Sequence, residues 1–555
     1  MLMTGAQAVV AGLKAEGVEL VFGYPGGAAL NLYDALYDSG ITHILARHEQ
    51  GAAHAADGYA RSTGKVGVCL ATSGPGATNL VTGIATANMD SVPMVFITSQ
   101  VGTSLIGKDS FQEADITGIT TPITKHNFLV KRPQDLMKTV KEAFYIARTG
   151  RPGPVLIDIP KDITGMEGDF TYPESINLRG YHPLFEGDPS KIEELAAAIK
   201  KAKKPMVFVG GGLRIAGAWS EFASFIEKTG IPVVSSLMGL GCFPADHELY
   251  LGMLGMHGTY TANQSVTQCD LLIGIGVRFD DRVTGLVSKF APEALIVHMD
   301  IDPAEINKNV RTDIKILGDL KWSLPLLSQM AEPGDIAAWQ KQVLAWKQER
   351  PLRFEENGDV IKPQSVVKAI SDITEGSAFL VTDVGQHQMW AAQYYNSKKP
   401  RRFITSGGLG TMGYGLPAAI GAQLGNPDET VWAIAGDGGI MMNIQEIATA
   451  VEHQLPIKVV VINNQGLGMV RQWQRIFYDQ RYSCSRYGTE TDLAKVAEAF
   501  GAKGIKVQEP GELIPALQEA NNYCGPVFID VLVCDQENVL PMVPAGAPID
   551  QMIGG

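Results

Sequence analysis

Apolar and polar positions alternate in a clear pattern between residues 431 and 464. An apolar, β-rich run at 431–435 ends in a Gly-Asp-Gly turn, a stretch with apolar residues at helical spacing follows, and a second apolar run at 458–462 ends in Asn463-Asn464. Short apolar runs bounded by turn residues are typical of buried strands. The stretch therefore predicts strand, turn, helix and strand, the right-handed crossover of a parallel sheet.

Similar apolar runs recur along the chain, each followed by a turn and a helix-like stretch. They lie at 20–22, 66–71, 94–98, 155–159, 205–209, 231–235, 271–275, 295–299 and 380–383. Strands that alternate with helices favour a doubly wound parallel sheet. We therefore expect an α/β fold of three doubly wound parallel-sheet domains, at residues 1–165, 191–345 and 363–555, with linkers at 166–190 and 346–362.

The composition is that of a large globular protein. The 555 residues exceed what one core accommodates, and Thr4 with Gln7 predicts a capping box on the first helix. The net charge of −13 argues against nucleic acid or an anionic membrane as a partner. Six scattered cysteines without a CxxC pair favour a reducing compartment. With no recognisable signal peptide or membrane-spanning run, we expect a soluble, cytoplasmic protein.

Two strand ends in the last domain carry side chains suited to a metal ion. Asp437 offers a carboxylate and Asn464 an amide oxygen, both hard donors that suit Mg²⁺ or Ca²⁺. In parallel sheets, ligands bind at the carboxyl ends of the strands. The glycines beside Asp437 leave room for a phosphate to approach backbone N–H groups. A Gly-Asp-Gly turn alone, however, is a common tight turn.

The spacing from Gly-Asp-Gly to Asn-Asn resembles the signature of the thiamine diphosphate enzymes, in which Mg²⁺ bridges the cofactor's diphosphate to the protein. The resemblance implies that Asp437, Asn464 and the carbonyl of Gly466 are the metal ligands. It also implies that thiamine diphosphate contacts a larger set of residues, which are Val384, Gly385, Gln386, His387, Gly410, Met412, Gly436, Asp437, Gly438, Asn464, Gly466, Leu467, Gly468, Met469 and Val470.

Arg47-His48-Glu49-Gln50 precedes a helix of small residues. By itself, Glu49 is a solvated carboxylate at a helix start, where the helix dipole favours it. The segment resembles the one in which thiamine diphosphate enzymes carry a glutamate that binds the cofactor's pyrimidine ring and assists proton transfer within it. This implies that the first domain binds the pyrimidine and the last the diphosphate. Because Glu49 and Asp437 would then touch one cofactor from different domains, at least a homodimer with the active site at its interface is expected.

Residues 108–125, KDSFQEADITGITTPITK, resemble a segment of the acetohydroxyacid synthases almost residue for residue. On composition alone they form an irregular loop. The resemblance implies that Gln112 faces the reactive ring of the cofactor and that Phe111 walls the substrate pocket. It also places Lys161 at the mouth of the site, so that the expected catalytic residues are Glu49, Gln112, Lys161 and Arg282.

The central domain has glycine-rich strand ends that are compatible with a dinucleotide. Gly210-Gly211-Gly212 is not the dinucleotide fingerprint, and simple strand-to-helix turns explain it equally well. Segments within 254–258, 276–285 and 298–302 nevertheless resemble FAD-binding segments of the acetohydroxyacid synthases. The resemblance implies a structural FAD bound by Arg151, Gly210, Gly211, Gly212, Leu237, Met238, Leu254, Gly255, Met256, His257, Gly276, Val277, Arg278, Asp280, Arg282, Asp300, Ile301 and Asp319.

The same resemblance implies a substrate pocket lined by Phe111, Met256, Arg282 and Trp473. A guanidinium such as that of Arg282 is the expected partner of a 2-ketoacid carboxylate. From the hydrophobic pattern alone, Trp473 is predicted to be part of a short amphipathic helix. In the family its indole shapes a slot for the additional methyl group of 2-ketobutyrate. The Pro/Gly-rich C-terminal tail is expected, by analogy, to close over the site.

Because these motifs span nearly the whole chain in the family's order, the chain resembles the catalytic subunit of the acetohydroxyacid synthases. The resemblance implies that pyruvate is decarboxylated and its hydroxyethyl unit joined to a second pyruvate or to 2-ketobutyrate. The products would be 2-acetolactate or 2-aceto-2-hydroxybutyrate, the first common step of branched-chain amino-acid synthesis, and a small regulatory subunit is an expected partner. The alternatives are an FAD-independent catabolic acetolactate synthase, another thiamine diphosphate-dependent 2-ketoacid decarboxylase or oxidase, and an inactive cofactor-binding scaffold.

Overall fold

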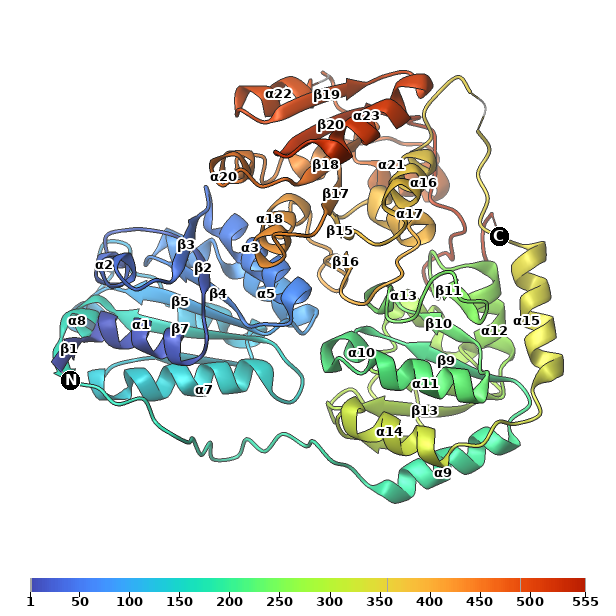
Figure 1. Ribbon diagram of the computed structural model, residues 1–555, viewed down its shortest axis with the longest axis horizontal. Coiled ribbons are helices and arrows are strands. Elements are labelled where there is room, and N and C mark those ends of the chain that lie inside the picture. The colour runs from blue at the N-terminus through green and yellow to red at the C-terminus, as the bar shows by residue number, and fades with distance from the viewer. Residues whose placement is uncertain (1, 357, 490, 555) are drawn as a thin grey trace.

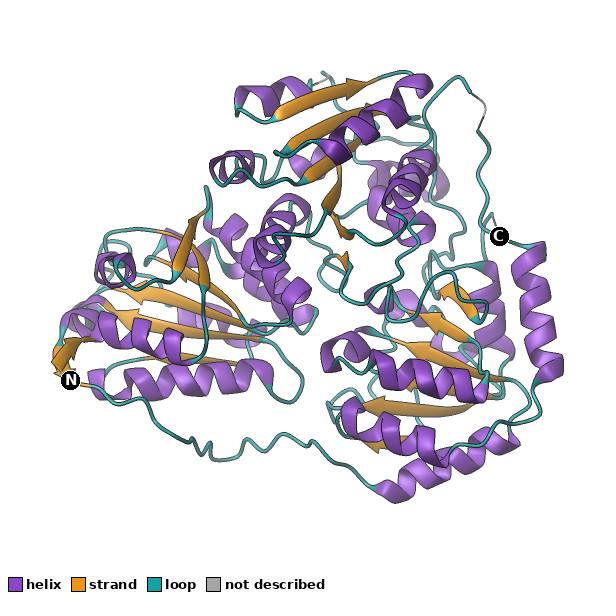
Figure 2. Ribbon diagram, in the orientation of Figure 1, coloured by secondary structure: helices purple, strands orange, loops and turns teal. Residues whose placement is uncertain are grey.

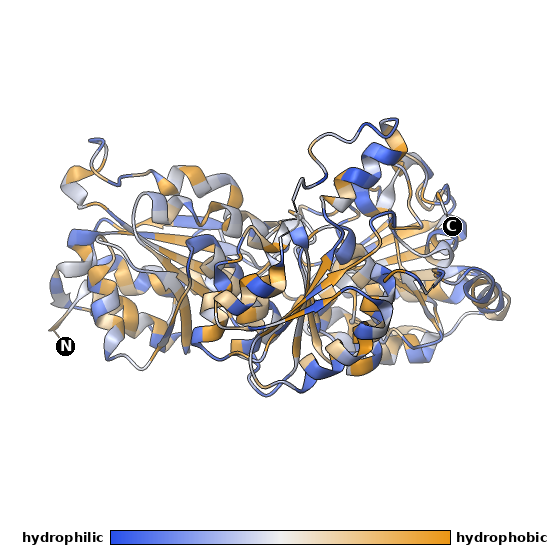
Figure 3. Cartoon of the chain, turned by 90° about the horizontal axis from the view of Figure 1, so that it is seen from above, coloured by the Kyte–Doolittle hydropathy of each residue, from blue (hydrophilic) through white to orange (hydrophobic). Residues whose placement is uncertain are grey.

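The chain folds around three six-stranded parallel sheets, as Figures 1 and 2 show for a computed structural model that describes residues 2–356, 358–489 and 491–554. A small antiparallel sheet joins β1 (Leu2–Thr4) to β8 (Glu167–Asp169). Each large sheet is covered by helices on both faces, and Figure 3 shows the hydrophobic residues concentrated on its strands. The expected α/β class with three doubly wound parallel sheets is therefore confirmed.

The first sheet has the strand order β3-β2-β4-β5-β7-β6. Its strands are β2 (Leu20–Tyr24), β3 (Thr42–Leu45), β4 (Gly67–Ala71), β5 (Met94–Gln100), β6 (His126–Leu129) and β7 (Pro154–Pro160). Apolar residues of α1, α2 and α7 fill one face, and those of α3 and α5 fill the other. The helices are α1 (Gly5–Ala15), α2 (Leu30–Tyr37), α3 (Glu49–Thr63), α4 (Pro75–Thr78), α5 (Val81–Met89), α6 (Ile116–Thr120), α7 (Leu136–Arg148) and α8 (Lys161–Gly165). The predicted capping box of Thr4 and Gln7 opens α1.

The central sheet has the order β11-β10-β9-β12-β13-β14. Its strands are β9 (Pro205–Val209), β10 (Val233–Ser235), β11 (Tyr250–Met253), β12 (Leu271–Ile275), β13 (Leu295–Asp300) and β14 (Ile314–Leu317). The helices are α9 (Pro189–Lys201), α10 (Gly211–Ala216), α11 (Trp219–Thr229), α12 (Tyr260–Gln268), α13 (Asp281–Thr284), α14 (Leu320–Met330) and α15 (Ala337–Glu349). Trp339 and Val343 of α15 belong to the core of this sheet, and the helix itself runs to Glu349, past the boundary expected at residue 345.

The third sheet has the order β16-β15-β17-β18-β20-β19. Its strands are β15 (Phe379–Thr382), β16 (Phe403–Ile404), β17 (Val431–Gly436), β18 (Lys458–Asn463), β19 (Lys503–Val507) and β20 (Val527–Leu532). The helices are α16 (Pro363–Thr374), α17 (Gln386–Tyr394), α18 (Gly415–Gly425), α19 (Asp437–Ile440), α20 (Glu446–Glu452), α21 (Gly468–Phe477), α22 (Leu493–Ala499) and α23 (Pro510–Asn522). β17 and β18 are parallel neighbours, as the pattern between residues 431 and 464 predicts.

The first and third domains are joined by the close crossing of α3 and α18, which lie side by side in Figure 1. A Cβ on Gly421 of α18 would stand 2.6 Å from the carbonyl carbon of Ala55 on α3. Beside the crossing, the buried Arg61 pairs with Asp57 on its own helix and donates 2.9 Å to the carbonyl oxygen of Thr405. Small residues and this buried ion pair therefore set the distance between the two domains.

The C-terminal tail packs on the central domain. The backbone N–H of Val543 donates to the Met256 carbonyl (2.8 Å), and that of Leu286 donates to the Ala547 carbonyl (3.0 Å). Ile549 is buried in the core of the central domain. The tail thus lies against two of the segments that resemble FAD-binding motifs. Among the described helices, none combines the length and the apolar character that crossing a membrane requires.

Candidate active site

The carboxyl ends of β17 and β18 bring Asp437 and the turn after Asn463 together. One carboxylate oxygen of Asp437 accepts from the N–H of Gly438 (3.0 Å) and the other from the N–H of Gly466 (2.9 Å). Burial raises the pKa of Asp437 to about 6, although these two N–H groups oppose the shift. A nearby cation would reverse that effect of burial by favouring the charged carboxylate.

Asn464 supplies an unpaired acceptor at the same strand end. Its side chain is buried, and its amide nitrogen donates to the Gln386 side chain at 3.2 Å. Its amide oxygen has no hydrogen-bond partner among the described residues. Buried polar atoms are rarely left unpaired, so this oxygen is available as an acceptor or ligand atom for a bound group. No group of three His, Cys, Asp or Glu side chains suited to a metal occurs in the described parts of the chain. A hard cation here would therefore use one carboxylate, one amide oxygen and backbone carbonyl oxygen, a donor set that fits Mg²⁺.

Asp383, at the end of β15, ties two glycine-rich loops together. Its fully buried carboxylate accepts from the N–H groups of Val384 (2.7 Å), Gly413 (3.0 Å) and Gly415 (3.1 Å). Burial raises the pKa of Asp383 to about 6 against the effect of these donors. The loops that contain the expected contacts Gly385 and Gly410 are thus held by a residue that the sequence motifs did not indicate.

The expected thiamine diphosphate contacts come from four adjoining segments of the third domain. A Cβ on Gly438 would stand 2.9 Å from Leu467 and 3.6 Å from Met412, and one on Gly468 would meet Asn464. The ring of His387 packs against Gly436, and burial lowers the pKa of this histidine to about 3, so it is neutral. Because a side chain at these glycines would collide with its neighbours, each glycine permits a close approach of backbone segments.

Glu49 begins α3 in the first domain and is nearly buried, with 8% of its surface exposed. One carboxylate oxygen accepts from the Asn79 amide at 2.9 Å, and the other would lie 3.1 Å from a Cβ on Gly76. The turn around Gly74 meets the backbone of Gln112, which has a left-handed φ of 59°. Asn79 lies three residues after the Thr-Ser-Gly-Pro-Gly segment that ends at Gly76, and this position and its amide side chain are the signals that would have indicated it.

The loop that carries Phe111 and Gln112 is held by hydrogen bonds to its own Glu113 side chain. Glu113 accepts from the backbone N–H groups of Gly107 and of Ser110, the latter at 3.0 Å. Phe111 is 88% exposed, and Lys161 is exposed at the start of α8. A large aromatic side chain that is this exposed is suited to contact another molecule.

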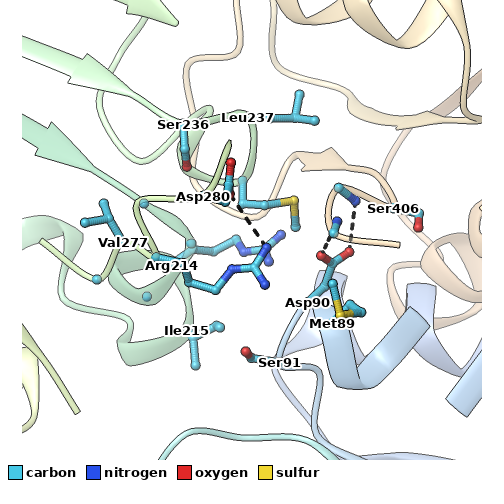
Figure 4. A pocket seen from close by; sticks show the side chains of 18 of the residues that line it. Met89, Asp90, Ser91, Arg214, Ile215, Ser236, Leu237, Val277, Asp280 and Ser406 are labelled. Atoms are coloured by element: carbon cyan, nitrogen blue, oxygen red, sulfur yellow. Dashed lines mark hydrogen bonds and ion pairs between the residues drawn. The ribbon is translucent and has the colours of Figure 1, made fainter. Parts of the chain in front are cut away.

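A cavity of about 860 Å³ lies where the three domains meet. Every residue expected to bind FAD lines it except Gly255, whose backbone packs against Arg282. The expected thiamine diphosphate or substrate residues that also line it are Val384, Gly385, Gly410, Met412, Met469, Met256, Arg282 and Trp473. Figure 4 shows additional lining residues from the first and central domains that the motifs did not indicate, among them Asp90, Ser91 and Arg214.

The cavity does not include the first-domain residues of the expected active site. Of the described residues that line the cavity, none is Glu49, Phe111, Gln112 or Lys161, although all four were expected in the active site. The cavity therefore unites the expected FAD and substrate residues with part of the thiamine diphosphate set, while Glu49 lies in the first domain beside Asn79.

Comparison with known proteins covers all three domains. Family models described as the N-terminal TPP binding domain, the central domain and the C-terminal TPP binding domain of thiamine pyrophosphate enzymes match residues 3–119, 192–327 and 383–531. The acetolactate synthase large subunit of Haemophilus influenzae is 49% identical over 561 residues, covering 99% of this chain and 98% of the relative. The isozyme 3 large subunit of Escherichia coli is 49% identical over 566 residues, with the same coverage. The large subunit of Corynebacterium glutamicum is 51% identical over 557 residues, covering 98% and 89%.

Proposed function

The chain belongs to the acetolactate synthase large subunits among the thiamine pyrophosphate enzymes, and we propose that it joins two 2-ketoacids with loss of CO₂. Pyruvate is the donor, and the acceptor is a second pyruvate or 2-ketobutyrate. The strongest support is that Asp437 and the unpaired side-chain oxygen of Asn464 lie at the ends of adjacent strands, where both can bind a metal ion. The chain is also similar to these enzymes over its full length. The enzyme is then a transferase of branched-chain amino-acid biosynthesis.

Thiamine diphosphate, when bound, supplies a carbon nucleophile that attacks the keto group and makes loss of CO₂ possible. In our proposal, Asp437, Asn464 and the Gly466 carbonyl hold Mg²⁺, which fixes the cofactor's diphosphate. The buried Asp437 carboxylate and the unpaired Asn464 oxygen support this assignment. The loops clamped by Asp383 contribute Gly410 and Met412 to the same cofactor.

Glu49 binds the pyrimidine ring in this proposal, and Asn79 orients it. With one oxygen engaged by Asn79, the other would be left to bind the cofactor's ring nitrogen. Since Glu49 does not line the cavity, we propose a homodimer in which each Glu49 serves the Mg²⁺ site of the partner subunit. Exposed Phe111 would then enter that site across the interface, together with Gln112 and Lys161.

The cavity is assigned to FAD, which we propose to be structural because the overall reaction transfers no electrons. Support comes from the lining of the cavity by almost all residues of the FAD-like segments. Arg282, which also lines it, has a 57% exposed side chain and is proposed to bind the 2-ketoacid carboxylate. Met256 and Trp473 are proposed to form the apolar wall beside it.

Two further assignments concern a partner subunit and the cellular location. Because they are large subunits, a small regulatory subunit is a proposed partner. A cytoplasmic location is the remaining proposal.

The proposal is tested by incubating the purified chain with pyruvate and 2-ketobutyrate, with and without thiamine diphosphate, Mg²⁺ and FAD. We expect both acetohydroxy acids, lost when either thiamine diphosphate or Mg²⁺ is omitted. Glu49→Gln should lower the rate at least 100-fold, the lower end of a general acid–base contribution, which is about 10²–10⁴-fold.

Other products would refute the proposal. Acetaldehyde or acetate alone would identify a decarboxylase or oxidase, and full activity in flavin-free protein would favour a catabolic, FAD-independent synthase. No turnover by a chain that binds the cofactor would indicate a scaffold. Near-full activity of Glu49→Gln would contradict the role given to that carboxyl group.

A further inference from the structure

Arg214 is a buried cation in the three-domain cavity. It lies in α10, two residues after Gly212, and only 3% of it is exposed. Figure 4 shows its side chain reaching toward the middle of the pocket, between the sides that carry Asp280 and Asp90. The sequence motifs that resemble FAD-binding segments did not include this residue.

The guanidinium of Arg214 has no hydrogen-bond or ion-pair partner among the residues that the structure describes, in contrast to other arginines around the cavity. Arg151 pairs with Glu305 at 2.6 Å, and Arg278 approaches Asp280 at 3.8 Å. The nearby Asp90 already accepts from Arg61 (2.9 Å) and from the N–H groups of Gly407 (3.0 Å) and Gly408 (2.7 Å). Asp90 therefore has little acceptor capacity left for Arg214.

The electrostatic surroundings make this unpaired charge unfavourable. Burial, together with the positive charges of Arg61 and Arg401, lowers the pKa of Arg214 to about 10, while Cys242 and Asp90 oppose the shift. Arg214 nevertheless stays charged at neutral pH. A buried charge without a partner is costly, and buried arginines normally meet an anion. Arg214 thus presents to the cavity a positive charge that an anionic ligand would neutralise.

We propose that Arg214 binds the diphosphate of the dinucleotide that occupies this cavity, which rests on the proposed binding of FAD. The diphosphate is the anionic part of a flavin adenine dinucleotide, whereas its ring systems are uncharged. A planar guanidinium donates to phosphate oxygens in pairs and is less hydrated than an ammonium group. Arg214 would therefore be a binding residue, and the empty cavity would be destabilised by its charge.

Flavin titration tests this assignment. The purified chain is stripped of flavin and titrated with FAD, with flavin fluorescence as the signal, for wild type, Arg214→Lys and Arg214→Met. We expect Arg214→Met to weaken FAD binding roughly 10- to 100-fold, the range for a lost hydrogen bond to a charged group, and Arg214→Lys to keep part of the affinity. The affinity of wild type should fall more steeply with salt than that of Arg214→Met. Arg148→Gln is the control, because Arg148 borders the cavity but bonds to Glu16 at 2.8 Å.

Thermal unfolding separates a binding role from a structural one. Without FAD, Arg214→Met should be at least as stable as wild type, because the variant removes an unpaired buried charge. With FAD, its rise in unfolding temperature should be smaller than that of wild type. A variant that is less stable without FAD yet binds FAD with wild-type affinity would overturn the inference. If wild type bound no FAD, the inference and the flavin assignment would both fail, whereas formation of acetohydroxy acids would be judged separately.

Discussion

Replacing Gly421 by alanine tests whether the crossing of α3 and α18 positions the two halves of the site. The new Cβ would come closest to the Ala55 carbonyl oxygen, and would stand 2.6 Å from the Ala55 carbonyl carbon and 2.9 Å from the Tyr59 nitrogen. Ordinary contacts begin at 3.4 Å. All these obstacles are backbone atoms of α3, which cannot rotate away, so the helices must move apart.

The expected cost follows from two opposing effects. Overpacking typically costs about 1–3 kcal/mol, and backbone obstacles place this site at the upper end. Alanine in place of glycine within a helix stabilises the folded state by about 1 kcal/mol, because alanine has the higher helix propensity. The net loss of about 2 kcal/mol corresponds to a fall of about 4–8 °C in the unfolding temperature of a domain of this size. Because α3 carries Glu49 at its start, a shift near 1 Å should also lower kcat, by up to about 100-fold.

The assay compares Gly421→Ala with Gly511→Ala, which makes the same chemical change in α23. A Cβ on Gly511 meets nothing within 4 Å, so this control should keep its kcat and unfold at the wild-type temperature or slightly above it. Both variants are followed by thermal unfolding and by acetohydroxy acid formation at saturating thiamine diphosphate and Mg²⁺. If Gly421→Ala matched the control in both measurements, the close crossing would have no part in positioning the site.

Three other predictions concern single side chains. Asn79→Ala should lower kcat about ten-fold, because Glu49 loses a hydrogen bond worth about 1.5–3 kcal/mol, while an unchanged kcat would show that Asn79 does not orient it. Trp473→Leu should reduce the preference for 2-ketobutyrate by about ten- to hundred-fold, since one methyl group contributes about 1–3 kcal/mol; product ratios in a mixture of the two ketoacids measure this, and a constant ratio would contradict it. Burial raises the pKa of Asp158 from 3.8 to about 6, so the folded chain binds a proton more tightly than the unfolded chain, and wild type should gain roughly 2 kcal/mol over Asp158→Asn as the pH falls from 7 to 4. Unfolding temperatures of both chains across that range should converge or cross accordingly, and a constant difference would refute the assignment.

The interior strands were predictable because each is a continuous apolar run. β4, β5, β7, β9, β12, β17 and β18 all lie near the ranges that the pattern indicated. The six strands at the sheet edges, β3, β6, β11, β14, β16 and β19, were all missed. Edge strands are short and exposed on one side, so their sequences lack a continuous apolar run. The interior strand β20 was missed as well, and its apolar pattern is interrupted by Asp530, which accepts from Asn463 at 2.9 Å.

The sequence by itself determined the three parallel sheets, the family, and the strand ends that carry Asp437 and Asn464, because hydrophobic periodicity and short motifs are local properties of the chain. Only the tertiary structure decided which distant residues share one environment. It placed Asn79 against Glu49 and joined two loops through Asp383, and among the described residues it left the Asn464 oxygen and the Arg214 charge without a partner. Burial and pairing depend on segments hundreds of residues apart, and no local pattern records them.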